Sequence, residues 1–352
     1  MSGFLSRSGP RLTASRLVGL LALCLVVAGV VAIVAPLIGV TEDRAGRHLE
    51  LLGTSAFDPA STEHAILWVR IPRVLASFLV GGALAGAGCA LQALLRNPLA
   101  EPFTLGISSG SSLAAVLAIR LGIAGQHGGF GVGAAALVGA FATLILVWRL
   151  AWTGRELPPA TLVLAGIAVS GFCASASVLI QATTDFAEMA SMLRWMMGGL
   201  DSIELASVQQ AALPILGGLA VLLMYGRELN ALAAGTEAAA SVGVAVARTQ
   251  LVVFAVTSLL VGAAIALAGP IGFVGLIVPH ALRALLGADH RVLLPASMLG
   301  GGVLLTLCDT LARTLVAPAQ LPTGALTAVL GGPFFFYLLI KHKRSAALWR
   351  RA

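Results

Sequence analysis

Two short motifs in this sequence have spacings that belong to hydrolases or metal sites in other proteins. The segment Gly106-Ile-Ser-Ser-Gly110 matches the GxSxG nucleophile elbow, which requires a strand-to-helix turn and later acidic and histidine partners. Here the segment opens a hydrophobic helix, so serine hydrolysis is not expected. His280 and His290 form neither an i,i+4 pair nor an HExxH motif, so they do not predict a metal site.

The chain also lacks the sequence features of nucleotide hydrolysis and of thiol chemistry. It contains no Gly-x-x-x-x-Gly-Lys-Ser/Thr segment, so we expect no ATP hydrolysis by this chain itself. The cysteines lie within or at the edges of apolar segments and have no CxxC spacing, which is typical of small apolar side chains. They are Cys24, Cys89, Cys173 and Cys308. We therefore predict no catalytic residue, no metal site and no cofactor.

The composition indicates that the solvent of this chain is lipid. It is 58% hydrophobic and 11% charged, whereas a soluble domain carries about 25% charged residues. The runs 17–40 and 74–95 contain no charge, and each has the roughly 20 apolar residues that a helix needs to cross a bilayer core. Because the runs are continuous rather than alternating, they predict helices and not a lipid-facing barrel.

The apolar windows predict an all-α polytopic membrane protein with about ten transmembrane helices. The first run is longer than the apolar core of a signal peptide, so it is expected to remain as a span. A single permease-like domain, 17–340, then lies between a segment 1–16 and a basic tail 341–352. The expected spans are 17–40, 70–95, 103–123, 130–152, 159–182, 205–225, 249–269, 271–286, 292–315 and 324–340.

The positions of Lys and Arg predict that both termini are cytoplasmic, which agrees with an even number of spans. In that orientation most of the 22 basic residues face the cytoplasm, and most acidic residues face outward. The formal net charge of +7 then reflects topology, so no nucleic-acid partner is expected. The basic residues left outside are Arg44, Arg47, Arg70, Arg73, Arg120, Arg194 and Arg313.

The interiors of the spans contain almost no ionisable residues, which bears on the energy source for transport. Proton- or sodium-coupled carriers usually place such residues at mid-membrane. Asp309 and Arg313 are the nearest candidates, but their i,i+4 spacing near the outer end of a span predicts a local ion pair. The energy for uphill transport is therefore expected from a partner.

Two polar segments on the cytoplasmic side suit such a partner. In the segment 96–102, two prolines end one helix and redirect the chain, and its turn residues are Asn97, Pro98, Glu101 and Pro102. The alanine-rich segment 229–243 predicts two short helices with a small, apolar exposed face, although an ordinary loop is the alternative. Gly235 would interrupt it, Thr236 would cap the second helix and Gly243 would end it. The residues expected to contact the partner are Leu229, Asn230, Ala231, Leu232, Gly235, Thr236, Glu237, Ala238, Ser241 and Gly243.

On the outer side, Arg70 and Arg73 flank Pro72 at an expected helix start, and Arg313 lies near another helix end. They are either a solvated rim or a surface that attracts an acidic partner protein. Between the expected spans 249–269 and 292–315, a Gly- and Pro-rich stretch is a suitable place for a broken, flexing helix. Its residues are Gly269, Pro270, Gly272, Gly275 and Pro279.

Taken in order, several segments resemble the FecCD-type permeases of type II ABC importers over roughly residues 65–340. The most specific is Gly269-Pro-Ile-Gly-Phe-Val-Gly-Leu-Ile-Val-Pro-His280. The others are Arg70-Ile-Pro-Arg73, Arg96-Asn-Pro-Leu-Ala-Glu-Pro102, Leu105-Gly-Ile-Ser-Ser-Gly110, Leu164-Ala-Gly-Ile-Ala, Trp195-Met-Met-Gly198, Asp289-His-Arg-Val-Leu-Leu-Pro295 and Leu321-Pro-Thr-Gly324.

This resemblance implies an importer subunit of the bacterial cytoplasmic membrane that pairs with a second copy of itself or with a related permease. It implies two cytoplasmic ATP-binding subunits and a periplasmic or lipid-anchored substrate-binding protein. The expected cargo is an iron chelate, with a ferric siderophore first and haem or cobalamin next, moved by alternating access. In the family, arginines matching Arg70, Arg73 and Arg313 receive acidic residues of the binding protein, and the segment matching 229–243 enters the ATPase cleft.

The second of these short helices departs from the family pattern. Family members often begin it with Gly-Glu-Glu and have Arg before a Ser-Leu-Gly ending, whereas this chain has Gly235-Thr236-Glu237 and then Ala240-Ser-Val-Gly243. A specific salt bridge to the ATPase is therefore not predicted. The alternative functions are a secondary carrier or exporter for a lipophilic solute and a membrane scaffold, which retention of an ATPase partner after purification would distinguish from an importer.

Overall fold

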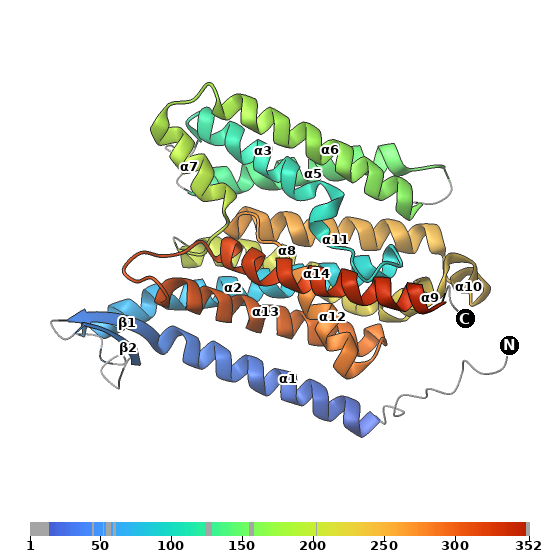
Figure 1. Ribbon diagram of the computed structural model, residues 1–352, viewed down its shortest axis with the longest axis horizontal. Helices are drawn as coiled ribbons and strands as arrows, with labels where there is room; N and C mark the ends of the chain where they lie inside the picture. The colour runs from blue at the N-terminus through green and yellow to red at the C-terminus, as the bar shows by residue number, and fades with distance from the viewer. Residues whose placement is uncertain are drawn as a thin grey trace.

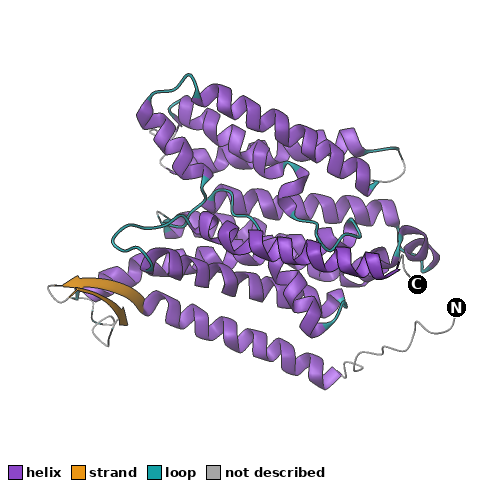
Figure 2. Cartoon of the chain, viewed as in Figure 1, coloured by secondary structure: helices purple, strands orange, loops and turns teal. Residues whose placement is uncertain are grey.

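The computed structural model describes residues 14–43, 46–51, 53, 58, 61–123, 129–154, 158–201 and 203–349 of the 352-residue chain. Helices make up most of this part of the molecule (Figures 1 and 2). In chain order the elements are α1 (Ala14–Val34), η1 (Ala35–Leu37), β1 (Ile38–Asp43), β2 (Gly46–Leu51), α2 (Thr62–Leu94), η3 (Pro102–Leu105), α3 (Ile107–Arg120), α5 (Gly129–Ala151), α6 (Pro159–Gln181), α7 (Phe186–Met196), α8 (Leu205–Met224), α9 (Gly226–Ala234), α10 (Thr236–Ser241), α11 (Val246–Ala268), α12 (Val274–Leu286), α13 (His290–Thr314) and α14 (Thr323–Trp349).

The helices confirm the prediction of a polytopic all-helical membrane protein. Within the described part of the chain, eight helices are long and apolar enough to cross a membrane, and α3 and α12 are shorter apolar helices. Together these account for the ten predicted segments. The long helices are α1, α2, α5, α6, α8, α11, α13 and α14.

Helix α2 forms the centre of the bundle because small residues let its neighbours approach closely. It packs against α13, α11 and α12, and most of its apolar stretch is buried. A Cβ atom added at Gly81 would lie 2.2 Å from the carbonyl oxygen of Gly301 on α13, so only glycine fits at this crossing. Helices α3, α5 and α6 pack on one another and join the rest largely through α11 (Figure 1).

The bundle has two distinct ends, which fit the predicted topology. The β1–β2 hairpin and α7 lie at one end, here named the hairpin end, and α9 and α10 lie at the other, named the α10 end (Figure 1). Helix α1 begins and α14 finishes at the α10 end, so the first and last described helices have their outer termini on the same side. This agrees with an even number of crossings.

Several predicted boundaries are wrong. The first span ends at Leu37 rather than at residue 40, since Ile38–Asp43 pairs antiparallel with Gly46–Leu51 in a hairpin that was not predicted (Figure 2). Helix α2 begins at Thr62 rather than near residue 70, because the Ser61 side chain caps it by accepting the His64 N–H at 3.0 Å.

The predicted terminal segments differ in how far the structure describes them. Residues 341–349 of the predicted tail continue α14 as helix, whereas residues 350–352 lie outside the described residues. Most of the predicted segment 1–16 also lies outside them, because the description begins with α1 at Ala14.

Candidate functional site

A cavity of about 920 Å³ at the hairpin end brings together the three arginines predicted to meet a partner protein. Arg70 and Arg73 come from α2, and Arg313 comes from the last turn of α13. Asp201 and Glu204 also line this cavity, so its charge is mixed rather than uniformly basic. The three positions are far apart in the sequence and meet because α2 packs along α13.

Arg73 is buried and forms an ion pair with Asp309 on the adjacent helix α13. Its residue exposure is 8%, and its Nε donates to Oδ1 and Oδ2 of Asp309 at 2.9 and 2.8 Å. Its Nη1 donates to Gln320 Oε1 at 2.6 Å, and Thr323 Oγ1 donates to Asp309 Oδ1 at 3.0 Å. This network ties α2, α13 and the start of α14 together and neutralises the charge of Arg73.

The predicted local pair between Asp309 and Arg313 is wrong, because the carboxylate turns to Arg73 on the adjacent helix. Arg313 instead donates from Nη2 to the carbonyl oxygen of Ala35 and, at 3.2 Å, to Thr310 Oγ1. Arg70 donates to the neighbouring carbonyl of Pro36 at 3.1 Å. Both arginines therefore hold the η1 turn.

At the α10 end, the structure contains the two short helices that the sequence predicts. Gly235 separates α9 from α10 with φ of 130°, and Gly243 follows α10 with φ of 85°. The predicted cap at Thr236 is wrong: Thr236 is the first residue of α10, and Gly235 occupies the N-cap position without a side-chain hydrogen bond.

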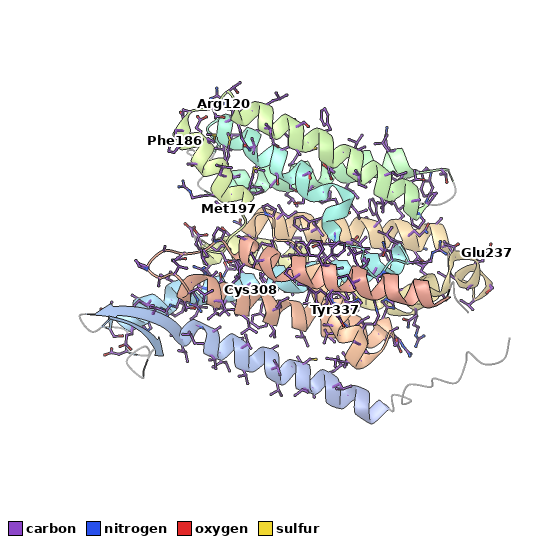
Figure 3. The ribbon with its side chains drawn as sticks, in the orientation of Figure 1. Arg120, Phe186, Met197, Glu237, Cys308 and Tyr337 are labelled. Carbon is purple, nitrogen blue, oxygen red and sulfur yellow. The ribbon has the colours of Figure 1, made fainter. Side chains whose placement is uncertain are left out.

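The segment 229–243, predicted to contact the ATP-binding partner, contains a buried set and an exposed set of residues, and Asn230, Ala231, Gly235 and Thr236 are half-buried. Leu229, Leu232 and Ala239 are buried and anchor the pair to the bundle. Within 229–243, the exposed surface is formed by small or apolar residues and one carboxylate, Glu237, which lies at the far end from Arg120 and Phe186 (Figure 3). The exposed residues are Ala233, Ala234, Glu237, Ala238, Ala240, Ser241, Val242 and Gly243.

Asn230 connects α9 to the start of α13. Its Nδ2 donates to Asp289 Oδ1 at 2.7 Å, and its Oδ1 accepts the backbone N–H of His290 at 2.8 Å. Asp289 caps α13, and hydrogen bonds from Arg291 and Asn230 hold the pKa of its carboxyl well below the usual range. A displacement of α9 would therefore act directly on the first turn of α13.

The predicted helix break lies between α11 and α12. Gly269 and Phe273 have φ of 67° and 68°, and α12 starts at Val274 with Pro279 inside it. Gly275 lies against α2, where a Cβ added at Gly88 would come within 2.1 Å of the Gly275 carbonyl oxygen. Pro270 and Gly272 fall in the irregular segment between the two helices.

The turn that follows α2 meets this helix break, a proximity that the sequence did not indicate. Asn97 Oδ1 accepts the Leu99 N–H at 2.9 Å and so forms the turn, and Pro98 lies within it. Pro102 begins the short helix η3, and the Glu101 carboxylate accepts the N–H of Phe273. Burial raises the pKa of Glu101, and the Phe273 hydrogen bond partly opposes that shift.

Sequence reasoning missed two residues that join α12 to α2. Gln92 Nε2 donates to the Gly275 carbonyl at 3.2 Å, and Arg283 Nη2 donates to Gln92 Oε1 at 2.8 Å. The available indication was a polar amide within the otherwise apolar run 74–95. With the Glu101–Phe273 contact, these hydrogen bonds link α12 to α2 and to the turn that follows α2, so movement of one of them must disturb the others.

The residues that resembled catalytic or metal motifs have other surroundings. Gly106–Gly110 opens α3 after a 3-10 turn, and no strand precedes it within the described segment 61–123. The His280 ring contacts Phe334 edge-on, whereas His290 bonds to Asn230. The four cysteines are free thiols. Among the residues that the structure describes, no group of three or more His, Cys, Asp or Glu side chains could hold a metal ion.

Comparison with known proteins places these features among transport permeases. The model of the FecCD transport family matches residues 24–341. The hemin transport system permease HmuU of Yersinia pestis is 40% identical over 283 residues, 80% of this chain and 84% of that protein. The cobalamin import permease BtuC of Halobacterium salinarum is 41% identical over 287 residues, 80% and 74% respectively. A solved inward-facing metal-chelate type ABC transporter aligns with a TM-score of 0.79 and 31% identity, covering 92% of this chain and 99% of that one.

Proposed function

Because the chain belongs to the FecCD transport family of ABC-importer permeases, we propose that it carries an iron chelate across the bacterial cytoplasmic membrane, with a ferric siderophore as the first cargo to test. As such a permease, it spans the membrane several times and leaves ATP hydrolysis to a separate subunit. Haem and cobalamin are the other cargoes, since they are named for relatives that are 40% and 41% identical. Family membership sets aside the secondary carrier and the scaffold as alternatives.

The observation that carries the proposal is that surfaces suited to two partners lie at opposite ends of the bundle. At the hairpin end, Arg70 and Arg313 line a cavity large enough to receive side chains of a docked protein. An acidic binding protein would meet cationic side chains in this cavity, although the charge of Arg73 is already neutralised by Asp309. At the α10 end, the exposed small residues of α9 and α10 offer a surface for an ATP-binding subunit.

The contacts between elements suggest how ATP-driven motion would reach the transport path. Closure of two ATP-binding subunits would displace α9, and Asn230 would transmit that displacement to Asp289 and so to α13. The irregular segment before α12 would flex, while Glu101 keeps the turn after α2 attached to it. Two permease copies arranged about a common path would thereby open alternately to the two sides of the membrane.

Uptake measurements test the cargo. Labelled ferric siderophores, haem and cobalamin are supplied in parallel to a strain lacking this gene and to the same strain with the gene restored, after redundant transporters have been removed. We expect the deletion to abolish uptake of a ferric siderophore selectively. Selective loss of haem or cobalamin uptake would reassign the cargo, and unchanged uptake of all three would refute the proposed substrate class.

A further inference from the structure

A second cavity, of about 280 Å³, lies at the α10 end between α9, the end of α2 and the start of α13. It is separate from the arginine-lined cavity at the hairpin end. Its charged lining groups are the guanidinium groups of Arg96 and Arg283, and the imidazole of His290 also lines it. No carboxylate is among the described residues that line it, so this cavity is strongly basic.

The basic groups come from three different parts of the fold, the turn after α2, α12 and the start of α13. Arg96 follows α2 with φ of 49°, a left-handed conformation that is uncommon for a residue with a side chain. The Arg283 guanidinium is positioned by Gln92, whose Oε1 accepts its Nη2 at 2.8 Å. The nearby Asp289 carboxylate does not line the cavity, and both of its oxygens have partners, Arg291 at 2.6 Å and Asn230 at 2.7 Å.

The hydrogen bonds of Asn230 define the protonation of His290. Because the Asn230 amide nitrogen donates to Asp289, its Oδ1 is the atom that faces His290 and accepts the His290 backbone N–H. The His290 Nδ1 lies 2.8 Å from the same oxygen and must therefore carry a proton. In the neutral ring, Nε2 is then an acceptor. His290 is only 3% exposed, and its Nε2 has no hydrogen-bond partner among the described residues.

We propose that this cavity binds a phosphate anion that retains a P–OH group, with free inorganic phosphate as the occupant. Two guanidinium groups would neutralise its charged oxygens by charge-assisted hydrogen bonds. The P–OH would donate to Nε2 of His290 and satisfy that buried acceptor. Sulfate has the same shape but carries no hydroxyl at neutral pH, so the site should discriminate against it. A lipid phosphate monoester has the same chemistry only while it keeps one proton.

The test is a titration of the purified full-length permease, in nanodiscs of zwitterionic phosphatidylcholine, with inorganic phosphate and separately with sulfate. Calorimetry should show saturable phosphate binding and sulfate binding at least about tenfold weaker, the loss expected for one hydrogen bond to a charged group. Arg96→Gln should weaken phosphate binding by about tenfold, and Arg96→Lys by less, since it keeps the charge. Equal affinity for the two anions, or no saturable binding, would overturn the proposal.

A matched control and a lipid arm make the result specific. Arg227→Gln removes an exposed arginine of α9 that does not line the cavity, so it should leave phosphate affinity unchanged. An equal loss in both variants would mean non-specific attraction and would overturn the site. Nanodiscs containing phosphatidate would show whether a lipid monoester displaces phosphate, which would support the chemistry and assign its source to the membrane. Binding is measured on the permease alone, so its failure would leave the proposed transport function untouched.

Discussion

Replacing Asp309 by Asn should strongly destabilise the protein, because Asp309 is the counter-charge of a buried arginine. The side chains of Arg73 and Asp309 are 9% and 2% exposed, and Nε and Oδ2 are 2.8 Å apart. In D309N, the guanidinium would remain buried, and Gln320 and Thr323 could offer it only neutral groups. Removing one partner of a buried ion pair costs about 3–5 kcal/mol of unfolding free energy.

The measurement is equilibrium unfolding in mixed micelles by titration with SDS, and the chain contains its own control. Arg120 and Glu188 form an ion pair at 3.2 Å with side-chain exposures of 45% and 31%. Solvent screens such a pair, so E188Q should cost less than about 1 kcal/mol. The double variant R73M/D309L, which leaves no buried charge, should recover most of the loss. If D309N were no less stable than E188Q, the buried network would not have the role argued for it.

Three further predictions concern pH and the two partners. Burial raises the pKa of Glu101 above its usual 4.5, so the folded protein binds that proton more tightly than the unfolded chain does. Stability should therefore fall as pH rises from about 4.5 through the raised pKa. The E101Q side chain can still accept the same N–H, so thermal melts of E101Q should lose this dependence of stability on pH. An unchanged dependence would contradict the assignment to Glu101. V242D places a charge at a position whose side chain is 71% exposed, so it should leave the melting temperature unchanged. It should reduce co-purification of the ATP-binding subunit. Full retention of that subunit would argue against docking at α10. The double variant R70Q/R313Q should weaken binding-protein affinity by about tenfold and reduce the salt dependence of that affinity. The control R194Q removes an exposed arginine of α7 and should change neither. Equal effects of the two variants would refute a specific docking site.

The membrane spans were predictable because lipid imposes their length and composition. A helix must satisfy its own backbone in the bilayer, so uninterrupted runs such as 74–95 permit few alternatives. The helix break at Gly235 was also predictable, because glycine adopts positive φ readily and so marks a break within a helical segment; Gly235 has φ of 130°. The hairpin was not predicted, because the first half of β1, residues 38–40, continues the apolar run of the first span, and the pattern changes only from Thr41 onward.

The errors in the candidate site arise where a distant residue competes with a local one. An i,i+4 spacing favours pairing of Asp309 with Arg313, yet α2 delivers Arg73 to the same carboxylate, and no local pattern encodes that helix contact. The attachment of Glu101 to Phe273 joins residues 172 positions apart, so it depends entirely on tertiary packing. Arg70 and Arg313 could be named from the sequence as outer-side arginines, but their meeting in one cavity depends on the fold.

The most direct test of ATP-driven import is accumulation of a labelled ferric siderophore by proteoliposomes. The permease is reconstituted with its ATP-binding subunits and binding protein, with ATP on the side of the α10 end. We predict accumulation that requires hydrolysable ATP and the binding protein and that persists when ionophores collapse proton and sodium gradients. Accumulation without ATP that is abolished by those ionophores would contradict the account.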